Sequence, residues 1–227
     1  MFLKTLYLCK MLTNTEENYL KAIFQLAHEA EHEETGTNRL AFALGIKPAT
    51  VNDMLKKLKL KKLVLNEKYG KIRLTKEGRR VAVQIVRKHR LWETFLYEKL
   101  EFSWDEVHEI AEQLEHIQSE KLIEKLEKFL GYPDTDPHGD PIPDAKGVMK
   151  ELRKVSLAEI RPGQVCQLVS VRDNSAVFLQ FVSELGISLR KKIKVLAIQE
   201  FDNSMKIEVD KKQHHVSQKF AENLLVK

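Results

Sequence analysis

The segment WDEVHEIAEQLEH, residues 104–116, places two histidines and five acidic residues in thirteen positions. At about 100° per residue, a helix would gather four of them in one arc beside its apolar stripe. These four are His108, Glu112, Glu115 and His116. Imidazole nitrogens and carboxylate oxygens are typical ligands of Mn²⁺, Fe²⁺, Co²⁺ or Zn²⁺. The segment therefore predicts a metal site, with Glu106 and Glu109 facing solvent.

A second candidate lies upstream in RKHRLWETFLYEKL, where His89 and Glu93 are spaced i, i+4 and share a helix face. Such pairs are also common on solvated helices, so a plain charged surface is the alternative interpretation. The two cysteines, Cys9 and Cys166, form no CxxC pair, and the absence of thiolates disfavours a structural zinc site.

The charges of the chain are unevenly distributed. Residues 1–80 hold 16 Lys/Arg against 9 Asp/Glu, residues 81–155 hold 11 against 16, and residues 156–227 hold 11 against 8. A basic first third indicates a polyanionic partner, and an acidic middle indicates a bound cation.

The elements of the basic third predict a helix-turn-helix. Residues 14–31 have a helical apolar stripe, with Asn14 or Thr15 as the expected cap. In TNRLAFALGIKPATVNDMLKKLKLKKLV, a short helix ends at Gly45, and a second helix begins near Pro48. This second helix would be the one that enters the major groove of DNA.

The next segment, LVLNEKYGKIRLTKEGRRVA, predicts strands at 63–65 and 72–74, a turn at Tyr69-Gly70 and a helix cap at Thr75. A two-stranded wing behind a helix-turn-helix makes a winged helix. Residues 47–80 hold 12 Lys/Arg and 3 Asp/Glu, which favours DNA binding over a merely solvated lysine face.

We assign two kinds of DNA contact to this segment. Early residues of the recognition helix would reach base edges or phosphates: Thr50, Asn52 and Asp53. Lysines would contact phosphates and supply affinity rather than sequence discrimination: Lys47, Lys56, Lys57, Lys68 and Lys71.

The C-terminal third changes to short alternating strands after a Pro- and Gly-rich stretch at 136–147, which predicts a linker. The expected fold is mainly α with small β parts. Its domains would be a winged helix at 1–80, a helical dimerisation and metal-binding domain at 81–147, and a five-stranded SH3-like barrel at 148–227. The apolar side of the short middle helices predicts a homodimer, whose two-fold axis would match a palindromic operator.

The chain resembles the metal-dependent repressors typified by the diphtheria toxin repressor and the manganese transport regulator. The resemblance rests on TEENYLKAIFQL, VNDMLKKL, IRLTKEG, RKHRLWETFL, EVHEIAEQLEH and DPHGDPIP, in the family's order along almost the whole chain. It implies that the C-terminal barrel is of the FeoA type. It also implies an activity: metal-activated repression of metal-uptake genes.

The resemblance implies two metal sites. The primary site would use positions that match Asn18, Glu112, Glu115 and His116, and the ancillary site those that match His89, Glu93 and His108. Some manganese-responsive members also use the loop that contains Asp136 and His138, and a few use the barrel, where Asp173, Ser175 and Gln180 are candidates. Glutamate at position 112, where iron-type members have cysteine, implies Mn²⁺ rather than Fe²⁺. Asn18 stands where manganese-type members have aspartate.

Other classes of protein fit the sequence less well. No apolar run reaches the ~20 residues that span a bilayer, and MFLKTLYLCK is not expected to be a signal peptide, with Met11 a second possible start. We expect a cytoplasmic repressor, with an iron-specific regulator as the nearest alternative. A di-metal enzyme is disfavoured because HEIAE lacks the second histidine of HExxH. A winged-helix regulator that needs no metal is the remaining alternative.

Overall fold

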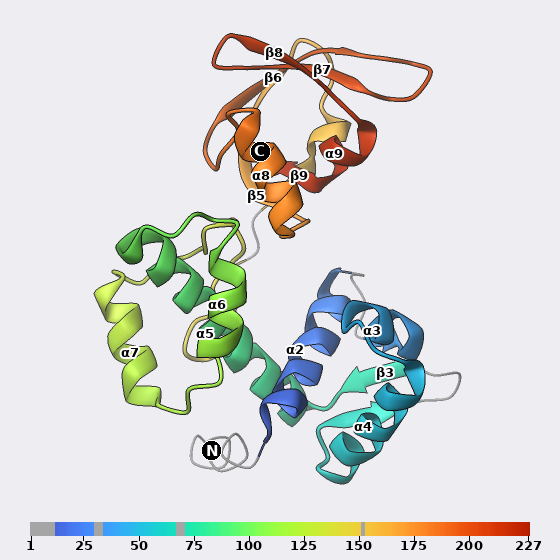
Figure 1. Ribbon diagram of the computed structural model, residues 1–227, viewed down its shortest axis with the longest axis vertical. Helices are drawn as coiled ribbons and strands as arrows, with labels where there is room; N and C mark the ends of the chain where they lie inside the picture. Colours follow the sequence, from blue (N-terminus) through green and yellow to red (C-terminus); the bar gives the residue numbers. More distant parts are fainter. Residues whose placement is uncertain (1–11, 30–33, 67–70, 151–152) are drawn as a thin grey trace. The chain divides into compact units, whose positions relative to one another are not determined.

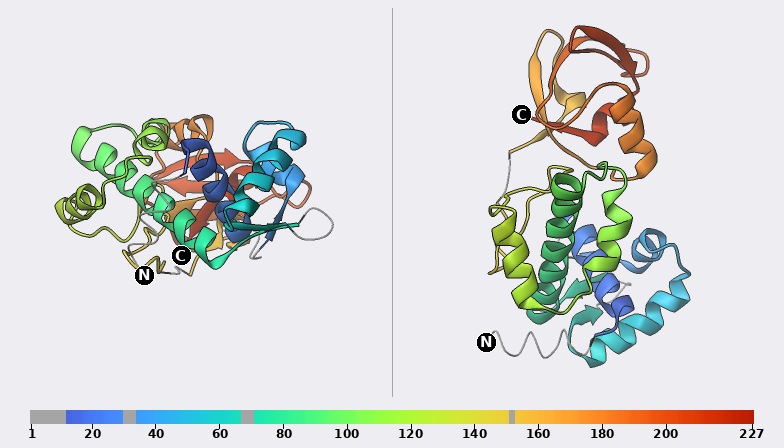
Figure 2. Two further views of the ribbon diagram at one scale, coloured as in Figure 1. Left: turned by 90° about the horizontal axis from the view of Figure 1, so that it is seen from below. Right: turned by 60° about the vertical axis from the view of Figure 1, so that its left-hand side comes forward.

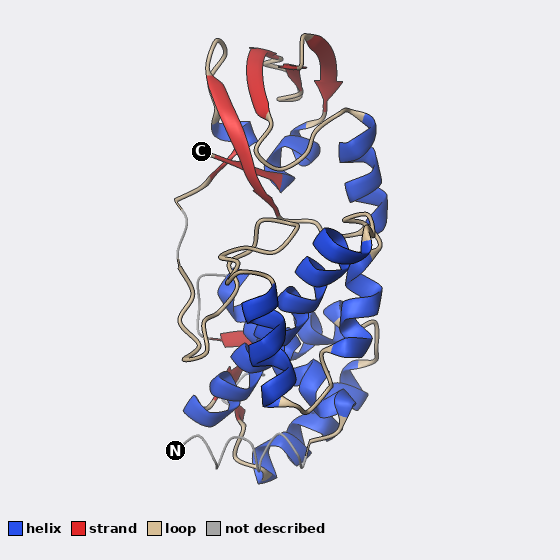
Figure 3. Ribbon diagram, turned by 90° about the vertical axis from the view of Figure 1, so that its left-hand side faces the viewer, coloured by secondary structure: helices blue, strands red, loops and turns tan. Residues whose placement is uncertain are grey.

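The computed structural model describes residues 12–29, 34–66, 71–150 and 153–227. The chain divides into two compact units, the first made of residues 1–89, 113–124 and 143–148, the second of residues 90–112, 125–142 and 149–227. Helices dominate, and the longer strands gather in the C-terminal part (Figure 3). Within the described residues, no helix is both long and apolar enough to cross a membrane. Some residues singled out from the sequence lie outside the described residues: Cys9, Met11, Lys68 and the predicted turn at Tyr69-Gly70.

Helix α2 (Asn14–Glu29) opens the first unit and buries Leu20 and Ile23 completely. Thr13 caps it. Its backbone N–H donates to Glu16 Oε2 (2.9 Å), and its Oγ1 accepts from the N–H of Glu16 (3.3 Å). This reciprocal pair is a capping box, so the predicted cap at Asn14 or Thr15 was wrong.

The predicted helix-turn-helix is confirmed as α3 (Thr37–Ala43) and α4 (Pro48–Leu60), which Figure 1 shows beside α2. Gly45 takes a positive φ of 64° in the turn, a conformation that costs glycine little. Pro48 stands at the start of α4, where the missing N–H has no helical partner to lose.

The wing contains β2 (Val64–Asn66) and β3 (Lys71–Leu74), as predicted to within one residue. A third strand, β1 (Glu34–Gly36), pairs with the other side of β3, so the sheet order is β1-β3-β2. Only three residues form β1, too few for a visible alternation in sequence. Helix α5 (Lys76–Leu100) follows, and Thr75 caps it as predicted, its Oγ1 accepting from the N–H of Gly78 at 3.0 Å.

Gly78 allows α5 to begin against the wing, because a Cβ at this position would lie 2.0 Å from the carbonyl oxygen of Leu63. We expect Gly78→Ala to destabilise the protein by about 1–3 kcal/mol, since the clash is with backbone. Thermal unfolding of Gly78→Ala and of a control variant, Gly36→Ala, measures this. Gly36 is the control because a Cβ at this position would meet nothing within 4 Å. Equal midpoints for the two variants would contradict the prediction.

The second unit combines the end of α5 with parts of α6 (Val107–Leu114) and α7 (Glu120–Phe129), and with a six-stranded sheet. The sheet order is β4-β9-β5-β6-β7-β8, one strand more than predicted. Its elements follow in the chain as β4 (Val155–Ser156), the 3₁₀ turn η2 (Leu157–Glu159), β5 (Val165–Val171), α8 (Ala176–Glu184), β6 (Lys192–Ile198), β7 (Met205–Val209), β8 (Lys212–Val216), α9 (Gln218–Asn223) and β9 (Leu224–Val226).

Figure 2 shows the curled sheet with α8 and α9 beside it, an SH3-like arrangement. The core of this sheet contains Leu168, Leu179, Ile193 and Ile207, all completely buried. The sequence pattern predicts only short strands in this third, but the helix α9 lies between β8 and β9. Ser217 instead caps α9 by accepting from the N–H of Phe220 at 3.1 Å, which divides the segment.

The stretch predicted to be a linker is packed against the sheet in its first half. Gly139, with φ of 84°, lies so close to β5 that a Cβ would be 1.9 Å from the Val169 carbonyl oxygen. The N–H of Val171 donates to the carbonyl of His138 at 3.1 Å. Asp136 and His138 are consequently buried, which fixes two of the predicted ligands in place.

Candidate metal centre

Glu115 lies at the centre of the candidate primary site, directly after the last residue of α6. Its side chain is completely buried, with the Lys21 ammonium 2.8 Å away and His89 Nδ1 at 2.6 Å from Oε2. Burial alone would raise the pKa of Glu115, but the hydrogen bond with His89 and the charge of Lys21 outweigh it and lower this pKa. Glu115 is therefore a buried carboxylate that carries its negative charge.

His116 is held by a residue that sequence reasoning overlooked. Its Nδ1 lies 2.6 Å from Oε2 of Glu17, and Oε1 of Glu17 accepts from Nε2 of Gln118 at 2.7 Å. His116 Nε2 is turned toward Glu115, 4.0 Å from Oε1. A metal-binding histidine usually has one ring nitrogen hydrogen-bonded to a carboxylate and the other free to bind the metal. His116 has this arrangement, with Glu17 at Nδ1 and with Nε2 facing Glu115.

Asn18 contributes an amide from α2. Its Oδ1 is buried and has no hydrogen-bond partner among the described residues. Buried polar atoms are rarely left without a partner unless a ligand or ion supplies one. The orphaned oxygen, together with the donor set of Glu115 and His116 in the same unit, fits a hard divalent cation.

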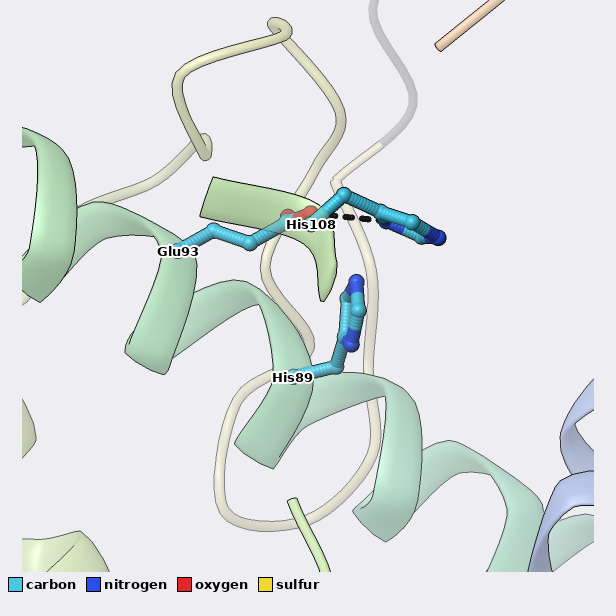
Figure 4. Close-up of side chains that lie close together, drawn as sticks. All are labelled: His89, Glu93 and His108. Atoms are coloured by element: carbon cyan, nitrogen blue, oxygen red, sulfur yellow. Dashed lines mark hydrogen bonds and ion pairs between the residues drawn. The ribbon is translucent and has the colours of Figure 1, made fainter. Parts of the chain in front are cut away.

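Glu112 and His108 lie together on α6, with His108 Nε2 3.4 Å from Glu112 Oε1. His108 Nδ1 is 3.2 Å from Oε1 of Glu93, a residue of α5 that is 2% exposed. Figure 4 shows this contact, with His89 one helical turn before Glu93 on α5. Glu112 thus contacts a residue assigned to the ancillary site.

A third group is formed by Glu93, Asp136 and His138, whose ligand atoms all lie within 4.8 Å of one another. All three are buried. His138 Nε2 donates to the carbonyl of Trp104 at 2.7 Å, and its Nδ1 lies 3.8 Å from Oε2 of Glu93. Glu93 therefore connects the two histidines His108 and His138, which the sequence places 30 residues apart.

Burial changes the proton affinities of this group. Desolvation and the nearby charges of Asp140 and Glu93 raise the pKa of Asp136 to about 7. Burial alone would lower the pKa of His138, but its interactions with Glu93 and Asp136 raise it to about 9. Buried acids and histidines with such shifts are typical of functional sites.

The remaining candidates in the barrel have other partners. Gln180 donates to Asp105 Oδ2 at 2.9 Å, and Asp173 accepts from the N–H of Ser175 at 2.9 Å in the turn before α8. Cys166 lies in the core of the sheet, where burial raises its pKa to about 11. No thiolate ligand is found among the described residues near these groups.

The predicted DNA-contacting residues that the structure describes are all exposed. On α4 and at its cap the exposed ones are Lys47, Thr50, Asn52, Asp53, Lys56 and Lys57. Asp53 forms an exposed ion pair with Lys56 at 2.9 Å on the surface of α4. Lys71 on β3 is also exposed and forms an ion pair with Glu34.

Three family models match consecutive parts of the chain. The N-terminal DNA binding domain of the iron dependent repressor matches residues 11–72, and its metal binding and dimerisation domain matches residues 75–144. A FeoA domain matches residues 155–227.

Individual curated proteins match the chain in agreement with the family models. The iron-dependent repressor IdeR of Mycobacterium tuberculosis is 35% identical over 136 residues, 58% of this chain and 56% of that protein. The diphtheria toxin repressor of Corynebacterium jeikeium is 31% identical over 150 residues, 66% of this chain and 62% of that protein. The match thus spans less than two thirds of the length of these curated relatives.

Solved structures match over more of the chain. A manganese-dependent transcriptional repressor in complex with manganese is 34% identical, with a TM-score of 0.84 over 93% of this chain and 98% of that one. The structure of ScaR with bound Cd²⁺ is 30% identical, with a TM-score of 0.79 over the same shares.

Proposed function

The chain belongs to the iron- and manganese-dependent transcriptional repressors, and on that premise we propose that it represses metal-uptake genes when a divalent metal is bound. It would act in the cytoplasm as a homodimer on a palindromic DNA operator. Mn²⁺ is the proposed effector, with Fe²⁺ as the alternative. Its family consists of repressors and not of enzymes.

The primary site carries the proposal. Asn18 on α2 and the adjoining pair Glu115 and His116 offer ligand atoms from parts of the chain that are 97 residues apart in sequence. Glu112, three residues before Glu115, would complete the set. A bound divalent cation supplies positive charge that offsets the repulsion between these carboxylates. Through the shared cation, Asn18 and Glu115 would then hold α2 in place, and with it the DNA-binding helices α3 and α4.

The ligand chemistry favours Mn²⁺. Carboxylate and amide oxygens with imidazole are hard or borderline donors. Position 112, where the family resemblance implies a cysteine in iron-type members, holds a glutamate. A relative of known structure is named as manganese-dependent. The relative IdeR is named as iron-dependent, which keeps Fe²⁺ as the alternative.

A second metal would be held by Glu93, which contacts His108 and lies beside His138 and Asp136. Two candidate ligand sets share Glu93. One is His89, Glu93 and His108, and the other is Glu93, Asp136 and His138. We assign His89, Glu93 and His108 to this second site, with Asp136 and His138 as further ligands.

Dimerisation would use the apolar side of α7. Phe129 is 64% exposed although its ring contacts that of Phe95, at 6.2 Å between centroids. An exposed aromatic side chain next to a second ring is typical of a protein interface. A two-fold dimer places two copies of α4 on successive half-sites, with the exposed lysines of α4 and β3 on phosphates.

Glu17 gives a first test of the primary site, because it contacts His116 and is not itself one of the proposed ligands. We expect Glu17→Gln to weaken Mn²⁺ binding by about 10–100-fold, as is usual when the partner of a metal-binding histidine is changed. Isothermal titration calorimetry measures this. Glu77→Gln, in an ion pair with Arg80 on α5, is the control, and unchanged affinity in Glu17→Gln would refute the role of Glu17.

The function itself is tested by retention of genomic DNA. Fragments of the host genome are passed over the immobilised protein with Mn²⁺ and then released with a chelator. We expect the released fragments to come from upstream of metal-transport genes. Fragments retained equally with the chelator present would favour a winged-helix regulator that needs no metal, and release of unrelated fragments would contradict the proposed targets.

A further inference from the structure

Lys21 is a buried cation whose ammonium contacts Glu115, a proposed metal ligand. Its side chain is 6% exposed and that of Glu115 is 0% exposed, with 2.8 Å between the ammonium and the carboxylate. A buried ammonium is costly unless it is paired and hydrogen-bonded. Lysine usually avoids this cost by extending its charged end to solvent, which Lys21 does not do.

The ammonium of Lys21 cannot serve as a ligand itself, because it has three N–H donors and no lone pair. It nevertheless uses the same carboxylate oxygens that a metal at the primary site would need. Two cations at one buried carboxylate repel each other, so each weakens the binding of the other.

Asn18 stands three residues before Lys21 on α2, so the two side chains share a face of the helix about one turn apart. The Asn18 Oδ1 atom is buried without a partner among the described residues, whereas Lys21 contacts Glu115. Helix α2 therefore carries both a cation for Glu115 and an unused oxygen that a bound cation would need.

We propose that Lys21 is a built-in cation that occupies Glu115 in the metal-free protein and competes there with the divalent effector. This inference rests on the proposed function. Lys21 keeps α2 attached to Glu115 when metal is scarce and lowers the apparent metal affinity. The apparent dissociation constant equals the intrinsic one divided by the fraction of molecules in which Glu115 is free. Lys21 thereby sets the metal concentration at which the protein responds.

The test is a pair of substitutions with the same change of charge. Lys21→Met keeps the length of the side chain and removes its charge. Lys150→Met is the matched control, because Lys150 pairs with Asp134 at 2.7 Å in an ion pair whose side chains are 75% and 71% exposed. Mn²⁺ affinity is measured by calorimetry and by competition with a chelator of known affinity. The competition starts from metal-loaded protein, so a variant that is unstable without metal still yields a value.

We expect Lys21→Met to bind Mn²⁺ about tenfold more tightly, within the ~5–150-fold range usual for coupled sites. Its thermal midpoint without metal should fall, and the rise in midpoint on adding Mn²⁺ should exceed that of the wild type. Lys150→Met should match the wild type in both measurements. A lysine with a merely structural role would destabilise both forms alike and leave the affinity unchanged.

Unchanged or weaker Mn²⁺ binding by Lys21→Met, while the wild type binds Mn²⁺, would overturn the role of Lys21 and leave the proposed function standing. Wild-type protein that binds no divalent metal would overturn both. Lys21→Gln is measured as a second variant, which retains hydrogen-bonding capacity without charge, and tighter binding is expected there too.

Discussion

We expect a Glu115→Gln variant to lose metal-activated DNA binding. The substitution removes the charge of the most buried carboxylate at the primary site while keeping its shape. We expect Mn²⁺ affinity to fall by more than the ~10–100-fold that the loss of a merely supporting group costs. Since Lys21 and His89 both contact Glu115, the metal-free protein should also become less stable. Calorimetry and operator binding with and without Mn²⁺ measure the two effects.

Glu109→Gln is the matched control, because Glu109 is an exposed glutamate on the same helix, α6. It should bind Mn²⁺ like the wild type. A Glu115→Gln protein that still responds at wild-type metal concentrations would show that the primary site is elsewhere.

The second large effect is expected for Glu93→Gln. Glu93 is 2% exposed and interacts with both His108 and His138. Removing one partner of a buried charge pair typically costs about 3–5 kcal/mol. The raised pKa of His138 means that its protonated form stabilises the fold fully below pH ~6.5, and this contribution is lost as the pH rises through about 9. The variant should lose stability mainly in the lower part of this range.

Urea unfolding in chelator, between pH 6 and about 9, measures the effect, and NMR titration of His138 shows whether its pKa falls. Glu98→Gln is the control on the same helix, because its carboxylate is 45% exposed and pairs only loosely with Lys99 at 3.6 Å. Equal stability of the two variants at neutral pH would contradict the buried role of Glu93.

The winged helix could be predicted because its signals are local. The apolar period of α4, the proline at its start and the glycine in the turn each specify the backbone within a few residues. Short elements such as β1 and α9 have no such signal. Strand β1 is recognised by its pairing with β3, and α9 begins at the cap supplied by Ser217.

The candidate site could be predicted in part. Helical phase grouped Glu112, Glu115 and His116, although α6 ends at Leu114 and the last two residues lie in the turn after it. Their partners could not be predicted, because Glu17 and His116 are 99 positions apart and Lys21 and Glu115 are 94 apart. The only signal was that Glu17 and Lys21 lie beside Asn18 on the face of α2 that adjoins its apolar stripe.

One description of the metal switch is that repulsion between carboxylates leaves the first helix loosely held until a metal binds. Lys21 and Glu17 of α2 already contact Glu115 and His116. Under the proposal made for Lys21, the switch is an exchange of cations at Glu115 and not the attachment of a free helix, and the two descriptions predict opposite effects of removing Lys21.

The most direct test of the account is a fluorescence anisotropy titration of a palindromic duplex, selected from a random library in the presence of Mn²⁺. Dissociation constants are compared with chelator, with Mn²⁺ and with anaerobic Fe²⁺. We predict that Mn²⁺ tightens DNA binding by about 10–100-fold, in the range of typical coupling between sites, and that Fe²⁺ has a smaller effect. Equal DNA affinity with chelator and with either metal would contradict a metal-activated repressor.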